Sequence, residues 1–365
     1  MKKFFYDTSL NSKNIGGVTK TIFYLFDAIN KITPEYKILG IQRKKTDYQL
    51  PPNVETQVIE FPYESTLWRN TIYPYFAFRN KGIPFYFPVN GNIPSWMPSS
   101  TPIITTFHDV LPLEIPGFFS SDKEEKKYIR KTQADIDRSD LIFTISEYSK
   151  IQLMKHFNID IEPVVLLNAP TINLLPENIP ESSDKGKYFL FNGRYDKRKG
   201  LDKLIKVFIY LHTTRKTDVK LYITGNPKFI SEEFEMNMRI AHQLGAVQEL
   251  GFVSDEEMAS LLKNSVAMLY PSRYEGFGLP PLEAMQVGCP VVTEYSSALP
   301  EVCDEAAIYA EVDETGEYAQ LLLKLIEDSN YRNHYIYKGF ERVKHFSWEK
   351  SAQVFIENLE TLNEE

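Results

Sequence analysis

The stretch Ser272–Gly288 reads SRYEGFGLPPLEAMQVG and decides the fold of its half of the chain. An apolar run at Val266–Tyr270 precedes it and predicts a buried β-strand. Two glycines allow the backbone to approach a ligand closely, and Pro280 and Pro281 suit the first turn of a helix. Gly288 suits the left-handed end of that helix. Strand, glycine loop and helix in this order are typical of a parallel α/β sheet.

The same stretch carries two carboxylates, Glu275 in the predicted loop and Glu283 in the first turns of the helix. Free N–H groups at a helix start attract an anion. The residues that form this start are Gly276, Phe277, Gly278 and Leu279. Two carboxylates beside a phosphate-binding loop would suit a sugar nucleotide, because one can accept hydrogen bonds from a ribose diol while the other reaches the sugar. A capped helix with two solvated glutamates is the simpler alternative, but the glycine–proline context favours a binding site.

Short apolar runs alternate with longer amphipathic stretches along the whole chain, which predicts βαβ units and parallel sheets. Expected strands of the first half are Lys3–Asp7, Tyr36–Ile41, Val54–Phe61, Pro84–Val89, Pro102–Phe107, Leu141–Ser146 and Val164–Leu167. Expected strands of the second half are Tyr188–Asn192, Val219–Thr224, Val247–Leu250, Val266–Tyr270, Pro290–Thr293 and Ala307–Ala310.

A chain of 365 residues is expected to form two domains, because one core rarely exceeds roughly 250–300 residues. Proline and serine are frequent in Asn168–Lys187, which is typical of a linker. We therefore expect domains at 1–170 and 171–345. A final helix at 346–365 is expected to pack on the first domain.

Charge and cysteine content exclude several classes of protein. The net charge is −8, with no long basic stripe, which argues against nucleic acid as a partner. Cys289 and Cys303 cannot build a disulfide framework, and no metal-ligand spacing surrounds them. The N-terminus reaches a charge too early for a signal peptide, and no apolar run is long enough to span a bilayer. A cytoplasmic location is expected.

A basic turn, GRYDKRKG, follows the expected strand Tyr188–Asn192 and precedes a predicted helix at Leu201–Leu211. Cations at the carboxyl end of a strand face the ligand crevice of an α/β domain. There, Arg can hold phosphate with two hydrogen bonds and Lys acts as a point charge. A solvated basic turn is the alternative, and the position between strand and glycine favours phosphate binding.

Ser272–Gly288 resembles the signature of the group 1, or family four, retaining glycosyltransferases. The likeness continues through Glu249–Ser254, Gly288–Val292 and Leu299–Val302 and covers essentially the whole second domain. It implies a GT-B fold, in which two Rossmann-like α/β domains with parallel sheets face a central cleft. It also implies a hexosyltransferase with a nucleotide-sugar donor.

The resemblance assigns roles to residues of the second domain. Arg194 and Lys199 match the pair that neutralises the donor diphosphate, so Lys197 and Arg198 are expected to point elsewhere. Val253 lies in the loop that resembles the family's base pocket. No metal ion and no further cofactor are implied.

The first domain matches the family more loosely. Gly16 and Gly17 resemble the glycine loop at which the backbone approaches the donor, although a plain strand–helix connection explains two glycines about as well. His108 ends the expected strand Pro102–Phe107 and matches a His-Asp-x-x-Pro segment in the polysaccharide-building branch. The resemblance implies that His108 contacts the transferred sugar and helps organise the reacting centre.

Two further features of the first half have simple structural explanations. Asp135-Ile136-Asp137 is a D-x-D sequence on a predicted helix, Asp122–Arg138, where residues i and i+2 do not share a face, so we expect a solvated helix face. Residues 61–97 hold eleven aromatics, which favour core packing. A surface for a lipid-linked acceptor or a membrane is the alternative there.

The predicted reaction moves a hexosyl group from a nucleotide-diphosphate sugar to a hydroxyl of a saccharide or lipid-linked saccharide. The resemblance implies retention of anomeric configuration and a role in cell-surface polysaccharide synthesis. It also makes GDP-mannose the first donor to consider, with a UDP-sugar open. A nucleotide-sugar epimerase of similar fold and a non-catalytic sugar-nucleotide-binding partner are the alternatives. Peripheral association with the inner face of the membrane is also open.

Overall fold

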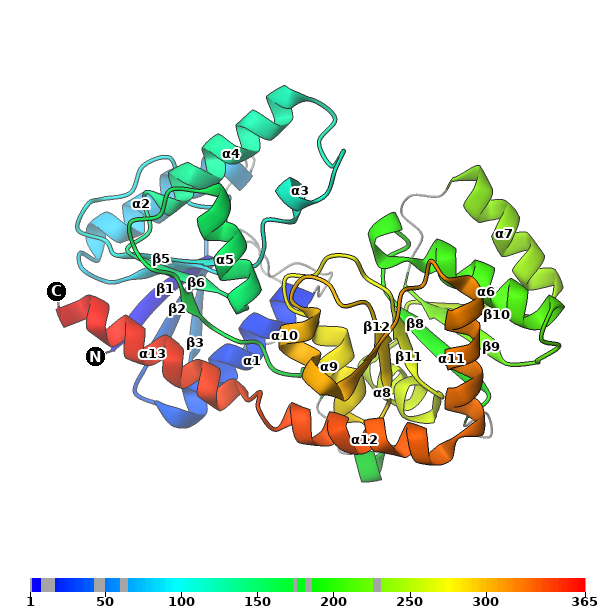
Figure 1. Cartoon of the computed structure of the whole chain (residues 1–365). Helices are drawn as coiled ribbons and strands as arrows, with labels where there is room; N and C mark the ends of the chain where they lie inside the picture. Colours follow the sequence, from blue (N-terminus) through cyan, green and yellow to red (C-terminus); the bar gives the residue numbers. More distant parts are fainter. Residues whose placement is uncertain are drawn as a thin grey trace. The chain divides into compact units, whose positions relative to one another are not determined.

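The computed structural model describes residues 2–7, 17–42, 50–59, 65–172, 176–180, 186–225 and 231–364. The chain divides into two compact units, Met1–Thr171 with Ser347–Glu365, and Ile172–Phe346. The first change of unit falls inside the proline-rich stretch at 168–187, and the last helix belongs to the first unit (Figure 1).

The first unit is built on a parallel sheet of strand order β3-β2-β1-β4-β5-β6-β7. Its strands are β1 (Lys3–Asp7), β2 (Lys37–Gln42), β3 (Val54–Val58), β4 (Phe85–Phe87), β5 (Ile103–Phe107), β6 (Leu141–Thr144) and β7 (Val164–Val165). Its helices are α1 (Gly17–Ile32), α2 (Ser65–Arg79), α3 (Leu111–Glu114), α4 (Asp122–Ile136), α5 (Glu147–His156) and α13 (Trp348–Glu364).

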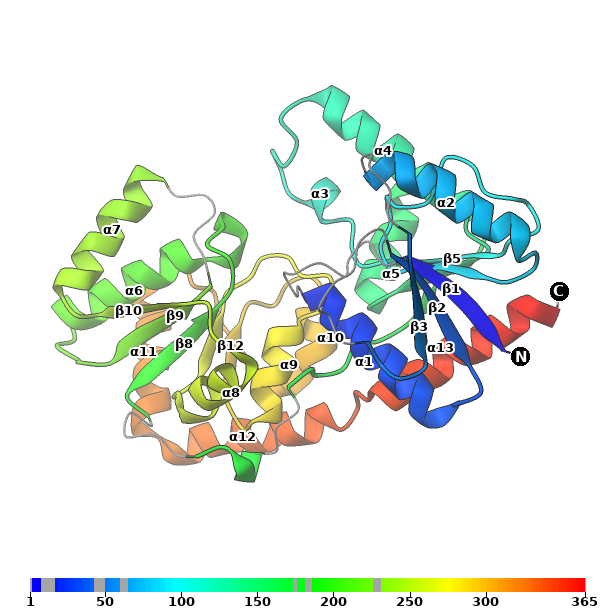
Figure 2. The same ribbon diagram turned by 180° about the vertical axis from the view of Figure 1, so that it is seen from behind.

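Both faces of this sheet are apolar because helices cover both. Neighbouring side chains of a strand point to opposite faces. Phe4 therefore packs with α1 and α13, whereas Phe5 packs on the side of α2. Figures 1 and 2 show α1 and α13 on one face and α2, α4 and α5 on the other. Helix α13 completes the core with Phe355, whose ring lies 5.4 Å from Phe4 and 5.2 Å from Phe143.

The second unit is also a parallel sheet, of order β10-β9-β8-β11-β12-β13. Numbered within the unit this is 3-2-1-4-5-6, the Rossmann order. Its strands are β8 (Tyr188–Asn192), β9 (Lys220–Thr224), β10 (Val247–Gly251), β11 (Met268–Tyr270), β12 (Val291–Thr293) and β13 (Ala307–Tyr309). Its helices are η2 (Pro176–Asn178), η3 (Lys197–Lys199), α6 (Leu201–Thr213), α7 (Glu232–Gln243), α8 (Asp255–Asn264), α9 (Leu279–Gln286), α10 (Leu299–Cys303), η4 (Asp304–Ala306), α11 (Thr315–Glu327) and α12 (Ser329–Val343).

The predicted α/β class with two Rossmann-like parallel sheets is confirmed, and each expected strand is present. Differences lie at the ends. The strand at Leu141 stops at Thr144, because the side chain of Ser146 already accepts from the amide of Ser149 and caps α5. Strand β3 ends at Val58, and Phe61 lies outside the described residues. Among the described helices, none is long and apolar enough to cross a bilayer.

Candidate functional site

Each sheet reverses its strand order at one point, between β1 and β4 in the first unit and between β8 and β11 in the second. In parallel α/β sheets, ligands bind outside the carboxyl ends of the strands at such a point. In the second unit the loops that leave β8 and β11 carry the basic turn and the glycine loop. The two loops touch, because the amide of Arg273 donates to the carbonyl of Arg198 at 3.0 Å.

Local sequence fixes the basic turn. The side chain of Asp196 accepts from the amide of Lys199 at 3.2 Å and caps η3. Gly200 follows with φ of +69°, and a Cβ at this position would lie 2.7 Å from the carbonyl oxygen of Pro271. Only glycine therefore lets the turn lie this close to the loop after β11.

A nearly buried ion cluster lies where the two loops meet. Three donors converge on Oε1 of Glu275. Nζ of Lys199 is 2.5 Å away and Nη1 of Arg198 is 2.9 Å away, and the hydroxyl of Ser272 completes the set. The Lys199, Arg198 and Glu275 side chains are only 10–13% exposed. Lys199 also donates to the hydroxyl of Tyr270, so two of its three N–H bonds have partners.

Burial and charge act against each other in this cluster. Burial alone raises the pKa of Glu275, but the charges of Lys199 and Arg198 outweigh it and hold that pKa below its usual value. For Lys199, burial lowers the pKa and Arg198 lowers it further, more than Glu275 raises it. Glu275 is therefore ionised at neutral pH and orders two cations whose remaining N–H groups can meet an anionic ligand.

The expectation for Arg198 was wrong. It was expected to point elsewhere, yet its guanidinium donates to both the carboxylate of Glu275 and the carbonyl of Tyr274. The reason is the backbone contact with Arg273, which holds Arg198 against the loop after β11. Lys197 is exposed, as is Arg194.

The glycine loop turns into α9 as expected. Gly278 has φ of +122°, and a Cβ there would approach Leu299 Cδ2 to 3.0 Å. Gly276 and Phe277 are buried, Leu279 begins the helix, and Glu283 is half-buried within it. Val253 is half-buried between β10 and the capped start of α8.

At the corresponding edge of the first unit, the described residues include a histidine and a buried carboxylate. His108 directly follows β5, and its Nε2 lies 2.8 Å from the carbonyl oxygen of Pro88, which follows β4. Because a carbonyl only accepts, Nε2 carries the proton. Burial lowers the pKa of His108, so the ring is neutral at pH 7 and Nδ1 keeps a lone pair. Gly17 opens α1 and is exposed, whereas Gly16 lies outside the described residues.

Asp7 is a residue that sequence reasoning missed. It ends β1 and is 1% exposed, and its carboxylate accepts from Tyr73 at 2.7 Å and from Asn92 at 2.8 Å. Arg69 extends this network by donating to Oδ1 of Asn92 at 2.6 Å. The sequence signal for this residue was an Asp at the carboxyl end of an otherwise apolar strand.

The D-x-D sequence was expected to form a solvated helix face, and this expectation is wrong for Asp135. Asp135 is 1% exposed, and its carboxylate accepts from the amide of Gly91 at 2.5 Å. Burial raises its pKa. Asp137 instead accepts from Gln133 on its own helix at 2.7 Å. Within the described part of the chain, no group of His, Cys, Asp or Glu side chains could hold a metal ion.

Comparison with known proteins shows which proteins the chain resembles. Residues 177–342, which contain the ion cluster and α9, match the glycosyl transferases group 1. The second unit therefore carries the sequence pattern of this family. O-antigen chain mannosyltransferase B of Escherichia coli is 27% identical to this glycosyltransferase over 256 residues, 67% of either chain. The serotype-specific mannosyltransferase WbdA of Escherichia coli is 23% identical over 70% of this chain, but over only 33% of its own length.

Solved structures show the same fold. HepE of Anabaena in complex with UDP-glucose matches 99% of this glycosyltransferase with a TM-score of 0.74 and 16% identity. Sucrose-phosphate synthase of Thermosynechococcus elongatus matches 99% of it with a TM-score of 0.74 and 16% identity. The enzyme is thus a hexosyltransferase of GT-B fold that resembles bacterial polysaccharide mannosyltransferases. The epimerase alternative is not favoured.

Proposed function

We propose that this glycosyltransferase moves a mannosyl group from GDP-mannose to a hydroxyl of a saccharide or lipid-linked saccharide, with retention of anomeric configuration. The observation that carries the proposal is the nearly buried cluster of Lys199, Arg198 and Glu275 beside the start of α9. Mannose as the sugar is supported by the relatives, several of which are named mannosyltransferases.

The second unit is assigned to the donor. Lys199 and Arg194, joined by Arg198, would carry the charge of the departing diphosphate, together with the amides of Gly276–Leu279 at the start of α9. Glu283 would accept from the ribose diol, and Val253 would contact the base. Gly16 and Gly17 would approach the donor from the first unit.

His108 and Glu275 are assigned to the transferred sugar. The three described donors use Oε1 of Glu275, which leaves Oε2 to accept from a sugar hydroxyl. The neutral ring of His108 would accept through Nδ1. In the proposed step the bond from the anomeric carbon to the diphosphate breaks, the acceptor oxygen bonds to that carbon on the same face, and the acceptor proton passes to the departing phosphate.

Donor hydrolysis and thermal shift test this proposal without a known acceptor. We expect GDP to raise the melting temperature more than UDP, and GDP-mannose to be hydrolysed slowly to GDP and mannose. A ligand at one hundred times its Kd adds about 2.7 kcal/mol of stability. Stabilisation by UDP but not GDP, with hydrolysis of a UDP-sugar, would show that the donor is a UDP-sugar and not GDP-mannose. Stabilisation by a nucleotide without hydrolysis of either sugar nucleotide would favour a non-catalytic binding protein.

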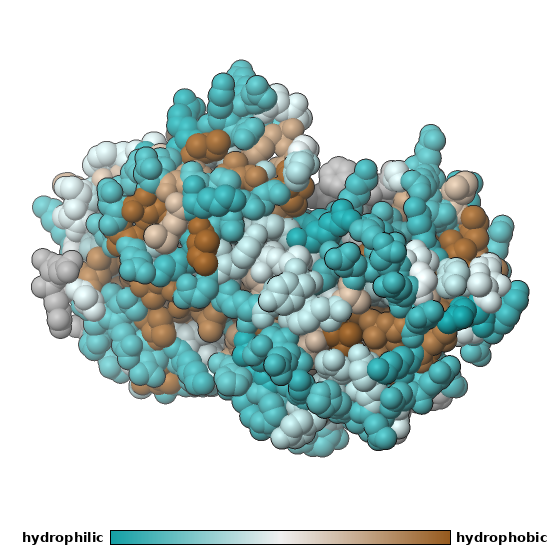
Figure 3. Space-filling view, viewed as in Figure 1, coloured by the Kyte–Doolittle hydropathy of each residue, from teal (hydrophilic) through white to brown (hydrophobic). Residues whose placement is uncertain are grey.

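A lipid-linked acceptor would bring the enzyme to a membrane, and the first unit carries a surface that suits one. Residues 65–108 contain no Asp or Glu but include the cations Arg69, Arg79 and Lys81. The aromatic region proves to be divided. Trp68 and Tyr73 are buried, whereas the exposed side chains are Tyr75 at 52%, Phe78 at 60% and Trp96 at 60%. Apolar surface is interspersed with polar surface over α2 and α4 (Figure 3).

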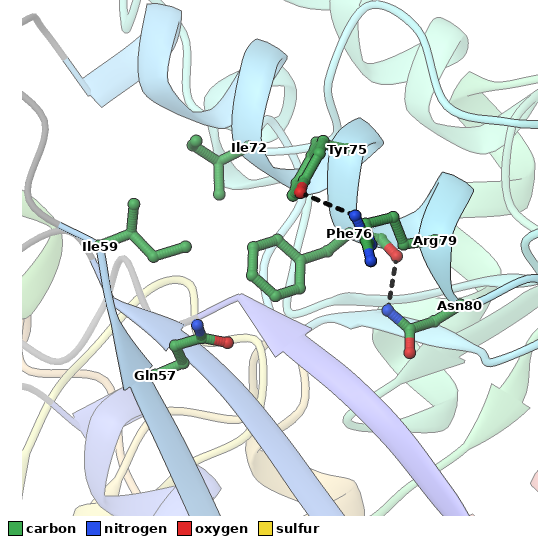
Figure 4. A pocket seen from close by; sticks show the side chains of 7 residues that line it. All are labelled: Gln57, Ile59, Ile72, Tyr75, Phe76, Arg79 and Asn80. Atoms are coloured by element: carbon green, nitrogen blue, oxygen red, sulfur yellow. Dashed lines mark hydrogen bonds between the residues drawn. The ribbon is translucent and has the colours of Figure 1, made fainter.

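A hollow of about 350 Å³ lies beside this surface between α2 and β3. Ile59, Ile72 and Phe76 form its apolar part, and Arg79 lies at Tyr75, to whose hydroxyl it donates at 3.3 Å (Figure 4). Basic and aromatic side chains together favour an anionic lipid interface. Co-sedimentation with vesicles tests this association. We expect binding to vesicles with anionic lipid, and loss of binding in Tyr75→Ser/Phe78→Ser. Equal vesicle binding by that variant would rule out this aromatic surface as the membrane contact.

A further inference from the structure

A second pocket lies at the carboxyl edge of the second sheet, on the far side of β11 from the donor cluster. It has a volume of about 440 Å³. Its walls come from the ends of three neighbouring strands, β11, β12 and β13. The residues that argue for a ligand are Arg273, Glu294, Tyr295, Tyr309, Glu311 and Asp313. Ligands of parallel α/β sheets bind at this edge, and pockets of this size hold small molecules.

Two tyrosines form one wall. The rings of Tyr295 and Tyr309 lie 5.1 Å apart at 71°. Tyr309 is fixed because its hydroxyl donates to the carbonyl of Asp304 at 2.8 Å. Tyr295 is 76% exposed, a large aromatic surface left facing solvent. Contact between this aromatic face and the C–H face of a sugar ring is favourable, because it removes apolar surface of both rings from water.

One carboxylate of the pocket accepts no hydrogen bond from the described residues. Glu294 is half-buried and accepts no hydrogen bond from any described residue. Beneath it, the hydroxyl of the buried Tyr318 also has no partner among the described residues. Burial, and then the charge of Glu294, raise the pKa of Tyr318. A half-buried carboxylate that accepts no hydrogen bond is costly, so a ligand hydroxyl that donates to Glu294 would be stabilised here.

The charge of the pocket restricts that ligand. Glu294, Glu311 and Asp313 oppose Arg273, whose guanidinium is engaged with Asp313 at 2.8 Å. Lys203 also pairs with Asp313, at 2.5 Å. The lining is acidic, so phosphate, nucleotide and uronate groups are repelled. A neutral, hydroxyl-rich ring meets both conditions, because its hydroxyls donate to Glu294 while its apolar face covers Tyr295.

The pocket is connected to the donor cluster. The hydroxyl of Ser296, in the pocket wall, donates to the carbonyl of Ser272 at 2.8 Å. The hydroxyl of Ser297 accepts from the amide of Glu275 at 2.8 Å. We propose that this pocket binds a neutral sugar ring of the acceptor chain, outside the donor site. The inference rests on the proposed function, because it names the acceptor as a neutral saccharide of more than one ring.

The test measures binding of α-linked manno-oligosaccharides of one to four units to the full chain by calorimetry, with saturating GDP. We expect affinity to rise with length and Tyr295→Ala to raise the Kd of the tetramer about tenfold, which corresponds to about 1.4 kcal/mol. Glu294→Gln, nearly isosteric, should raise it severalfold. Tyr337→Ala removes a tyrosine that is 66% exposed elsewhere in the unit and serves as control. The Kd of GDP should stay the same in all three variants.

Unchanged oligosaccharide affinity in both Tyr295→Ala and Glu294→Gln would overturn the proposal, as would the absence of binding by the parent chain. Tighter binding of spermidine, lost in Glu294→Gln, would make the pocket a cation site and equally overturn it. Failure of the donor assignment is separable. In that case GDP-mannose is neither bound nor hydrolysed, while the variants still differ in oligosaccharide binding.

Discussion

The two sheets share one strand order through six strands, yet their switch points carry different chemistry. At the switch point of the second unit, two cations converge on Glu275. At that of the first unit, Asp7 is held by the neutral groups of Tyr73 and Asn92. His108 nearby is neutral as well, because burial lowers its pKa.

This difference separates two tasks that the shared topology leaves open. Buried cations favour a ligand with phosphate, because electrostatic attraction is stronger where water is excluded. Neutral acceptors and a carboxylate suit hydroxyl groups and disfavour phosphate. We therefore infer that the switch point of the second unit binds the donor phosphates and that the switch point of the first unit meets hydroxyl groups. Each prediction below tests one side of that division.

The largest effect is expected for Lys199→Ala, on the cationic side. Loss of one preorganised charge contact to the departing diphosphate should lower kcat/KM about 10²- to 10³-fold. The measurement is donor hydrolysis or transfer under steady-state conditions. Lys206→Ala is the matched control, because Lys206 is exposed on α6 and its one ion pair within the described part of the chain is with the exposed Glu233. A Lys199→Ala variant within a few-fold of the parent would end the assignment of phosphate to the second unit.

The next largest effect concerns the stability that Glu275 contributes. Removing its charge in Glu275→Gln leaves Lys199 nearly buried without this anion and leaves Arg198 with the more distant Asp196 at 3.8 Å, which should cost about 3 kcal/mol at pH 7. Because the pKa of Glu275 is depressed in the folded chain, this contribution is complete above its ordinary pKa of 4.5 and is lost as the pH falls through the depressed value. Urea unfolding of both proteins from pH 7 to pH 3 measures it. The stability difference should shrink below about pH 4.5, and a constant difference would contradict a charged cluster.

The strands and the glycine loop could be predicted because their signals are local. Apolar runs of four to eight residues and the glycine–proline pattern are readable within one window. The partners of buried polar side chains are not local. Asp7 is held by Tyr73 and Asn92, 66 and 85 residues away, and Asp135 meets Gly91 across 44 residues.

Arg198 illustrates the same limit within the site. The resemblance pointed to Lys199, but the direction of its neighbour depends on a 3-10 turn that holds Arg198 against the loop after β11. Helical patterns also predicted that Asp135 and Asp137 diverge, without showing which of them meets a loop. Local sequence patterns therefore located the helices and strands, whereas the direction of a side chain could be seen only in the packed structure.

His108→Ala tests the neutral side. Its imidazole should contact the sugar, so turnover should fall about 10- to 100-fold, the loss of a hydrogen bond worth about 1.5–3 kcal/mol in the transition state. The affinity for GDP, which lacks the sugar, should not change. Melting temperature, GDP affinity and turnover are measured together. A lower melting temperature with normal turnover would show that the bond to Pro88 is structural, and the first unit would then lose its catalytic residue.

The smallest effect is expected for Glu283→Ala, on the donor side but outside the ion cluster. Glu283 is half-buried on α9, beyond the glycine loop that carries Glu275. If it accepts from the ribose diol, its loss should raise the Kd of GDP about tenfold, the value of one hydrogen bond to a charged group. The chemical step should be nearly unchanged once donor saturates, because the ribose does not react. Calorimetry with GDP and turnover at saturating donor separate the two effects, and Glu283→Gln should restore part of the affinity.

The comparison with Glu275→Ala is decisive, since Glu275 is assigned to the sugar and its loss should lower turnover more than GDP affinity. If Glu275→Ala weakens GDP more than Glu283→Ala does, the two carboxylates have the reverse roles, and the nucleotide extends over the ion cluster rather than along α9.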